Sequence, residues 1–375
     1  MTDPIMPGAR REQQRLSLAL LAVLCLTSLG IGLLAHLSPV IPRYVASELA
    51  RHRGTNGMYY FNGGYADAED YVLVGQVLKD DYARGGVYFF GASTTMISIM
   101  PWELAPAERA LIHNYAIGDI SHRETRHFLR SLVEEHDLLR AGGEKTTVML
   151  CLFYSMARRK APTGHFVARL FPRHGFYTFD TERGIHRVPM SAVELFLRRE
   201  RVYANRFLHV LTRRPSRVLP SELLDPMKFQ RQWTVTMGPD WRESMKAAMH
   251  DLAGLLDYLR TRRVRIRVIY PPHGSWQVGL PFNTAYREMV GPVLASRRIP
   301  VTDLSRLLPD EDFGDAGHLR YSGQGKLHQV YREMALHALA DMGTEPRTAA
   351  RPGPSGIFLR QGASRFGAQA RRRSP

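Results

Sequence analysis

Short runs of consecutive apolar residues recur through the middle of the chain. Runs of this length that end at Gly, Pro or Ser are typical of strands buried on both faces of a sheet. One such run is followed by a Gly-Ala-Ser turn and another by two prolines. We therefore predict buried strands at Gly86–Phe90, Thr146–Phe153, Val264–Tyr270 and Val301–Leu304.

A second pattern, with apolar residues three or four positions apart, separates these runs. It is clearest after Trp241, where Met245, Leu252 and Leu256 share one helical face. This pattern predicts helices at Glu124–Leu139, Trp241–Arg260, Tyr286–Ala295 and Gly323–Met342. Because strands alternate with helices, the expected fold is α/β, with a doubly wound (flavodoxin-like) parallel sheet and helices on both faces.

The N-terminal part of the chain contains one uninterrupted apolar run. Leu16–Leu37 has 22 residues without a formal charge, and a helix needs about 20 to cross a bilayer. Arg10, Arg11 and Arg15 precede the run, so the positive-inside rule places the N-terminus in the cytoplasm. A cleaved signal peptide is the alternative, although its apolar region is usually only about 7–15 residues long. We predict a single-pass anchor in a bacterial inner (cytoplasmic) membrane, with the remaining chain in the periplasm or otherwise outside the cytoplasm.

The other segments follow from these patterns. Residues 1–15 would be cytoplasmic, residues 38–80 would connect the anchor to the folded part, and residues 81–343 would form the globular domain. Residues 155–240 interrupt the alternation and are predicted to be an insertion with one long helix near Ala192–Leu211. The tail at residues 344–375 is basic and rich in Gly, Pro and Ala without periodicity, so we expect it to be disordered.

Composition excludes two classes of protein. The 375 residues include only two cysteines, Cys25 in the apolar run and Cys151 in a predicted strand, so a disulfide-stapled secreted scaffold is excluded. Only one apolar run is long enough to span a bilayer, which excludes a polytopic membrane protein.

The formal net charge of +16 raises the question of an anionic partner. Residues 158–217 contain 14 Lys and Arg against four acidic residues, and the tail carries a net charge of +6. Nucleic acid is the usual partner of such charge, but none is expected at the predicted location. Anionic lipid headgroups or an acidic polysaccharide fit better, and a solvated basic face without a partner is the alternative.

The first candidate for chemistry follows the first predicted strand. Ser93 lies on the turn after that strand, at the sheet edge where parallel α/β folds keep their sites. Gly91 and Ala92 are small enough to permit a tight turn and a close approach of substrate. If a helix begins at Ser93, its free N–H groups can stabilise an oxyanion. The alternative is that Ser93 only caps a helix.

Two further motifs complete the candidate site. Asn114–Asp119 contains Gly118, whose backbone N–H can face a developing negative charge. Asp315 and His318 lie three residues apart on a loop before the last predicted helix. A carboxylate against one imidazole nitrogen leaves the other nitrogen free to face a nucleophile. Taken singly, these motifs can also be a turn glycine and a surface Asp–His pair.

Together, the three motifs resemble those of the SGNH/GDSL hydrolase superfamily. The resemblance covers residues 87–342, with the insertion. It implies that Ser93 is the nucleophile, His318 the base and Asp315 the acid that orients it. It also implies that the N–H groups of Ser93 and Gly118 form an oxyanion hole. No cofactor and no metal are expected.

Two of the family's motifs differ in this chain. The usual Gly-Asp-Ser is Gly91-Ala92-Ser93 here, and the usual Gly-x-Asn-Asp is replaced by a segment that ends in Tyr154-Ser155. The family's Asn oxyanion donor is therefore missing. The hydroxyl of Tyr154 or Ser155 is the candidate replacement as a third donor.

The predicted anchor narrows the resemblance to membrane-tethered members of the superfamily. Those proteins work beside membrane-bound O-acyltransferases on cell-envelope polymers, as in D-alanyl transfer to teichoic acid and in alginate acetylation. The implied function is a serine acyltransferase or esterase acting on O-acyl groups of an envelope polysaccharide or related polymer. The implied partners are membrane lipid, a membrane-bound O-acyltransferase and an acyl-bearing glycan.

Two alternatives to this function stay open. The chain can be a catalytically weak scaffold or binding partner of an acyltransferase, or a lipase acting on membrane lipid.

Residues 268–273 and 301–305 are similar to stretches of the tethered relatives. On that basis Tyr270, His273 and Trp276 are candidates for a substrate groove, and a strand-to-loop junction with exposed aromatic residues is the alternative.

Overall fold

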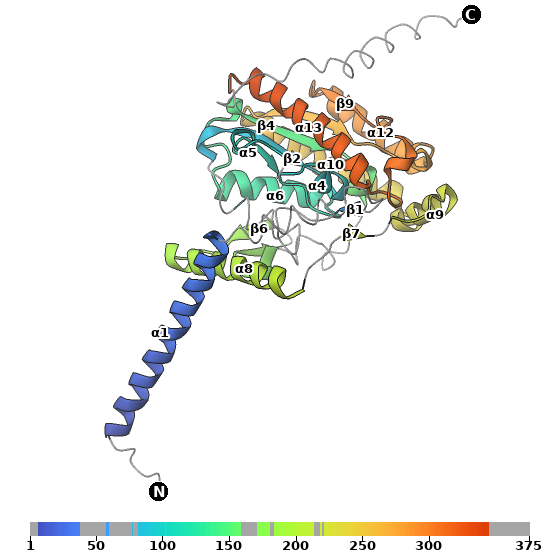
Figure 1. The fold of residues 1–375 in the computed structure, drawn as a ribbon. Coiled ribbons are helices and arrows are strands. Elements are labelled where there is room, and N and C mark those ends of the chain that lie inside the picture. The colour runs from blue at the N-terminus through green and yellow to red at the C-terminus, as the bar shows by residue number, and fades with distance from the viewer. Residues whose placement is uncertain are drawn as a thin grey trace, which may run out of the picture. The chain divides into compact units, whose positions relative to one another are not determined.

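The computed structural model describes residues 7–37, 58–59, 77, 82–101, 103–158, 171–180, 184–213, 218–219 and 221–344 (Figure 1). Most of the predicted connector, residues 38–80, lies outside the described residues. The predicted disordered tail also lies outside them, apart from Thr344.

A five-stranded parallel sheet forms the centre of the fold. Its strands lie in the order β3-β2-β4-β8-β9, so β2, the first of them in the chain, lies second from one edge, next to the edge strand β3. In chain order this sheet reads 2-1-3-4-5, the flavodoxin-like arrangement, so the predicted fold class is confirmed. The strands are β2 (Gly86–Phe90), β3 (Ile112–Asn114), β4 (Thr146–Cys151), β8 (Arg265–Tyr270) and β9 (Val301–Asp303).

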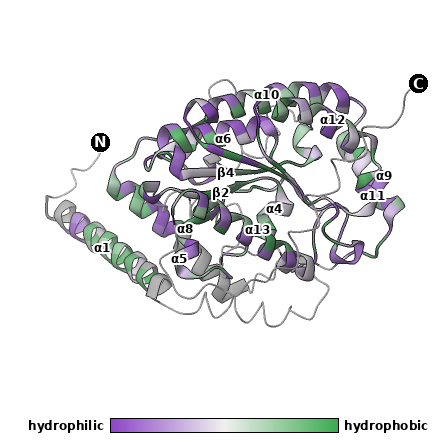
Figure 2. Ribbon diagram, turned by 90° about the horizontal axis from the view of Figure 1, so that it is seen from above, coloured by the Kyte–Doolittle hydropathy of each residue, from purple (hydrophilic) through white to green (hydrophobic). Residues whose placement is uncertain are grey.

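Helices cover both faces of this sheet (Figure 2). One face packs against α6 (His122–Glu135), α10 (Trp241–Thr261) and α12 (Pro281–Ala295). The other face packs against α13 (Tyr321–Asp341). The sheet is therefore the middle layer of three, and its inner strands β2 and β4 are buried along their whole length, as the sequence predicted. The prediction of a buried strand at Val301–Leu304 is wrong in its burial: β9 lies at the edge of the sheet, and Val301, Thr302 and Asp303 are all exposed.

The central strand β2 shows how the two cores are separated. Tyr88 and Phe90 point into the core with α6 and α10, whereas Val87 and Phe89 point into the core with α13. All four side chains are buried. Successive side chains on a strand alternate between faces, so one short apolar run supplies both cores.

Helices α6, α12 and α13 begin earlier than their apolar pattern predicted, and for α6 and α12 the reason is that the start signals are polar or proline residues. α6 begins at His122 after a capping box, in which the Glu124 N–H donates to Ser121 Oγ (3.2 Å) and the Ser121 N–H donates to Glu124 Oε2 (2.7 Å). α12 begins at Pro281, where proline is well suited to the first helical position.

The predicted insertion contains more structure than its one predicted helix. That helix is present as α8 (Ala192–Arg213). A second helix, α9 (Pro226–Met237), was not predicted. The insertion also contributes the antiparallel pair β5 (Tyr177–Asp180) and β6 (Gly184–Arg187), and β7 (Val218–Leu219), which pairs with β1 (Met58–Tyr59).

The N-terminal helix α1 spans Pro7–Leu37. Its stretch Glu12–Ile31 is long and apolar enough to cross a membrane and is not buried within the protein. The remaining short elements are α4 (Ser93–Ser98), α5 (Pro106–Arg109), α11 (Ser275–Val278), η2 (Tyr82–Arg84), η3 (Gly143–Lys145), η4 (Tyr154–Ala157), η6 (Phe171–His174) and η7 (Asp310–Asp312).

Candidate active site

Ser93 is the first residue of α4, directly after the turn that ends β2. Gly91 is required in this turn by close packing rather than by an unusual backbone angle. A Cβ atom at Gly91 would lie 2.6 Å from Thr95 Oγ1 and 2.9 Å from Cys151 Cβ. The absence of a side chain thus allows α4 to pack against β4 and sets the position of the Ser93 hydroxyl.

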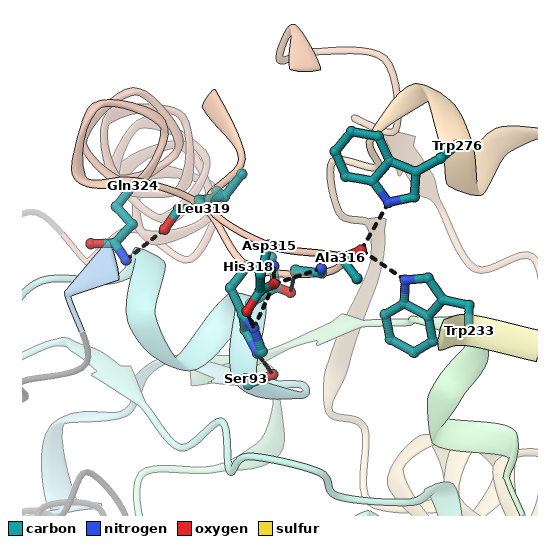
Figure 3. A network of polar contacts seen from close by, with 10 residues as sticks. Ser93, Trp233, Trp276, Asp315, Ala316, His318, Leu319 and Gln324 are labelled. Atoms are coloured by element: carbon teal, nitrogen blue, oxygen red, sulfur yellow. Dashed lines mark hydrogen bonds and ion pairs between the residues drawn. The ribbon is translucent and has the colours of Figure 1, made fainter. Parts of the chain in front are cut away.

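The structure brings Ser93 together with His318 and Asp315 (Figure 3). Ser93 Oγ lies 2.8 Å from His318 Nε2. On the other side of the ring, His318 Nδ1 lies 2.8 Å from Asp315 Oδ2 and 3.0 Å from Oδ1. This hydroxyl–imidazole–carboxylate chain has the distances at which a base can activate a hydroxyl nucleophile.

Asp315 also organises its own loop. The N–H groups of Gly317 and His318 donate to Asp315 Oδ1 at 2.8 and 2.7 Å. Burial would raise the pKa of the Asp315 carboxyl, but hydrogen bonds from the His318 ring and these N–H groups outweigh it, so that pKa lies below its ordinary value. Asp315 is therefore ionised at neutral pH and can stabilise a protonated His318 ring.

Ser93, Asp315 and His318 line a cavity of about 400 Å³. Gly118 and Ser155 lie in its wall together with Ser93, so three of the four predicted oxyanion donors reach the same space. Among the described residues, neither Ser93 nor Gly118 has a protein acceptor for its backbone N–H. The full lining is Ala92, Ser93, Thr94, Met96, Gly118, Asp119, Phe153, Ser155, Arg158, Gln232, Trp233, Thr236, Asp315, Ala316, Gly317 and His318.

Asn114, at the start of the second motif, has a structural role and does not line the cavity. Its side chain is buried, and its Nδ2 donates to the carbonyl oxygens of Met96 (2.9 Å) and Ile99 (3.2 Å). These bonds hold the end of α4 against β3. The Asn114 amide therefore fixes the helix that carries Ser93.

The expectation that Tyr154 offers a donor to the site is wrong. Residues 154–157 form the turn η4, which places the Tyr154 ring inside the core, fully buried. Its hydroxyl accepts a hydrogen bond from Gln277 Nε2 at 3.1 Å, and burial raises its pKa well above the ordinary value. Ser155, the other candidate, lines the cavity.

The predicted substrate groove is also wrong. Tyr270, His273 and Trp276 are all buried, and none of them lines the cavity. Tyr270 and Trp276 instead belong to the cores on opposite faces of the sheet, where burial of their aromatic surface stabilises the fold. His273 stacks on Phe153 with ring centroids 5.1 Å apart, and burial lowers its pKa to about 3. Arg287 lies over the Tyr270 ring at 4.7 Å.

Trp276 has a different role from the one predicted. Its indole Nε1–H donates to the carbonyl oxygen of Ala316 at 3.0 Å, and the Trp233 indole donates to the same oxygen at 2.7 Å (Figure 3). The loop that carries Asp315 and His318 is thus tied to α11 and to α9 at once.

The contribution of α9 to the site was not predicted from the sequence. Gln232, Trp233 and Thr236 of this helix line the cavity. Two signals could have revealed the helix. Asp225 caps it by accepting from the Lys228 N–H at 2.9 Å, directly before a proline at the first helical position. Its inward residues Phe229, Trp233 and Met237 are spaced four apart.

One ion pair lies at the wall of the cavity. Arg158 donates to Asp119 at 2.5 Å, and both residues belong to the lining. Arg158 is the first residue of the strongly basic segment, of which residues 159–170 lie outside the described residues. Within the described part of the chain, no group of three or more His, Cys, Asp or Glu residues is arranged to hold a metal ion.

No protein-family model matches the chain, and no curated protein matches it significantly.

Proposed function

We propose that this protein is a serine acyltransferase or esterase that acts on O-acyl groups of a cell-envelope polysaccharide or related polymer. The observation that carries the proposal is the Ser93–His318–Asp315 chain of hydrogen bonds at the wall of a cavity. Three side chains from two distant parts of the sequence meet there in the order that nucleophilic catalysis needs.

The first half of the reaction is acylation of the serine. Ser93 Oγ attacks the carbonyl carbon of an acyl ester while His318 Nε2 takes the hydroxyl proton. Ionised Asp315 stabilises the imidazolium, and the N–H groups of Ser93 and Gly118 stabilise the oxyanion, with the Ser155 hydroxyl as a third donor. The imidazolium then returns its proton to the departing alcohol, which leaves the acyl group on Ser93.

The second half transfers the acyl group to an acceptor. A sugar hydroxyl or a water molecule gives its proton to His318 and attacks the acyl carbon. The resulting intermediate then expels Ser93 Oγ, which takes the proton back from His318, and the free enzyme is restored. Gln232, Thr236 and the Arg158–Asp119 pair place polar groups in the wall of the cavity beside its apolar residues. These polar groups support an acceptor or donor that carries hydroxyl groups.

The proposed location is the periplasmic side of a bacterial inner membrane. Its support is helix α1, whose apolar stretch is long enough to cross a membrane, and the arginines that precede that stretch. A membrane-bound O-acyltransferase would then be the partner that supplies the acyl group across the membrane. Membrane lipid is the environment of α1, and nucleic acid has no place in this proposal.

A scaffold with weak or no activity is the second candidate. It is favoured by the substitution of the family's Asn by the segment at Tyr154 and Ser155, because Tyr154 faces the core. Removing one oxyanion donor typically costs about 3 kcal/mol of transition-state stabilisation. Such a protein would bind an acyltransferase and a glycan without turning over esters.

The test is covalent labelling of the full chain in detergent micelles with a fluorophosphonate probe, together with turnover of p-nitrophenyl acetate. We expect Ser93→Ala to lose both the label and the turnover. Ser296→Ala, which removes an exposed hydroxyl at the end of α12, should keep both. Equal labelling and turnover in wild type and Ser93→Ala would contradict the enzyme and favour the scaffold. Adding acylated and free oligosaccharides then separates transfer from hydrolysis by mass spectrometry of the products.

A further inference from the structure

Two indole groups from different helices donate to a single carbonyl oxygen beside the Asp–His pair. Trp233 Nε1 lies 2.7 Å and Trp276 Nε1 lies 3.0 Å from the Ala316 oxygen, which Figure 3 shows between the two rings. A carbonyl oxygen has two lone pairs, so the two tryptophans use its full capacity. We propose that Trp233 is a positioning residue that holds the Asp–His loop (residues 313–318) in reacting geometry; this inference rests on the proposed function.

The Asp–His loop is stiff enough to transmit such a restraint. Its residues are bonded to one another through Asp315 Oδ1, which accepts from the N–H groups of Gly317 and His318. The Gly314 N–H donates to the His318 carbonyl oxygen at 2.8 Å. A tether on Ala316 therefore fixes the carboxylate and the imidazole together.

The indole of Trp233 also packs directly on the loop. A Cβ atom at Gly317 would lie 2.8 Å from Trp233 Cζ2, so the ring leaves no room for a side chain there. On the other side, the Thr94 hydroxyl donates to the Gly317 carbonyl oxygen at 2.9 Å. Because Thr94 follows Ser93 in α4, the loop is held between the nucleophile's own helix and the Trp233 ring.

The position of Trp233 is itself set by the end of β4. Its ring meets Phe153 and Tyr154 edge-on, with centroid distances of 5.4 and 5.1 Å. Trp276, by contrast, is fully buried and packs on Phe229 and Phe313. Trp276 is thus part of the core, whereas Trp233 is half-buried and faces the cavity, where a bound substrate can touch it.

Through Trp233, α9 takes part in the proposed chemistry, although the parallel sheet itself does not need this helix. The helix belongs to the segment that interrupts the βα alternation, yet its indole donates the shorter of the two bonds to Ala316. A misplacement of about 1 Å at a reacting group can cost about 100-fold in rate. Loss of the Trp233 bond should therefore lower turnover more than it lowers binding.

The experiment compares Trp233→Phe with wild type in the full chain in detergent micelles. Phenylalanine keeps an aromatic ring and removes the N–H donor. We expect kcat for p-nitrophenyl acetate to fall about 10-fold, the lower end of the range seen when a metal-ligating side chain loses its hydrogen-bond partner. KM should change less than about 2-fold, and the midpoint of the pH–kcat/KM profile should shift. Trp233→Ala, which also removes the ring, should lose more.

The matched control is Trp241→Phe. Trp241 is a partly buried tryptophan at the start of α10 that packs near Phe282, with centroids 6.2 Å apart, and it does not contact the Asp–His loop. It should keep the wild-type kcat and pH profile. Melting temperatures of both variants show whether Trp233→Phe remains folded.

Three outcomes would count against the inference. Wild-type kcat and pH midpoint in Trp233→Phe would overturn it, and so would a loss of turnover that follows melting temperature with no shift of the pH midpoint. If wild type itself shows no turnover, the proposed function fails. The inference is then decided by the low-field proton resonance of the His318–Asp315 hydrogen bond: a shift in Trp233→Phe supports positioning, and an unchanged resonance overturns it.

Discussion

The Ser93 hydroxyl lies 2.8 Å from His318 Nε2, although the two residues are 225 positions apart in the chain. The parallel sheet accounts for this proximity. Ser93 follows β2 and the Asp–His loop follows β9, and the ends of parallel strands that face the same way meet at one edge of the sheet.

The members of the proposed triad should differ in how much activity each variant keeps. His318→Ala should remove nearly all turnover, as Ser93→Ala does, because these groups act as a unit. Asp315→Asn should keep more, with a fall of about 10⁴-fold in kcat, since it leaves the base in place but alters its hydrogen bond. The measurement is kcat/KM on p-nitrophenyl acetate for the three variants. Equal residual activity in all three would contradict these roles.

Gly91→Ala should destabilise the fold around the nucleophile. The new Cβ atom would lie 2.6 Å from Thr95 Oγ1 and 2.9 Å from Cys151 Cβ, and overpacking of this kind costs about 1–3 kcal/mol. Gly325→Ala in α13, where nothing lies within 4 Å of the added atom, should instead stabilise by about 0.5–1 kcal/mol. Urea unfolding of both variants tests the difference, and equal stability would show that the Gly91 turn can relax.

The Glu108–Arg332 pair should make stability depend on pH in the acid range. Hydrogen bonds from Arg332 hold the pKa of Glu108 below its ordinary value, despite burial. A carboxyl whose pKa is depressed by folding stabilises above its unfolded pKa of about 4.3 and loses that contribution as pH falls through its folded pKa. Glu108→Gln should therefore cost about 1–3 kcal/mol at pH 7 and progressively less below about pH 4.

The control for this pair is Glu103→Gln, which changes an exposed carboxylate in the loop before α5. It should leave both the stability and its pH dependence near wild type in urea unfolding of the full chain in micelles. Parallel pH curves for wild type and Glu108→Gln would contradict the prediction.

The proposed topology predicts where a reporter is active. A phosphatase that works only in the periplasm, fused after Met342, should be active, because the charge-free stretch of α1 follows three arginines. A fluorescent reporter that folds only in the cytoplasm should be dark at the same position. The reverse pattern would refute the location and, with it, the proposed envelope substrate.

Local sequence pattern was enough to predict those elements whose apolar spacing and turn residues indicate the same structure within a short stretch. The predicted strand Gly86–Phe90 is β2, and the predicted helix Trp241–Arg260 differs from α10 by one residue. Helix α9 was missed because its outward face carries the exposed apolar residues Met227 and Val235 among polar and charged residues, which obscures the helical spacing of its inward face. Burial of that inward face comes from segments far away in the chain, which a local pattern does not register.

By itself, the sequence determined the alternation of strands and helices, the long apolar N-terminal stretch, and the presence of Ser93, Asp315 and His318 on loops beside predicted strands. It determined them because hydrophobic periodicity and turn residues act over a few positions. Only the tertiary structure decided which side chains face the cavity. Tyr154 and Trp276 turned into the core while Ser155 and Trp233 reached the cavity wall, because the direction of a ring depends on what packs against it from distant parts of the chain.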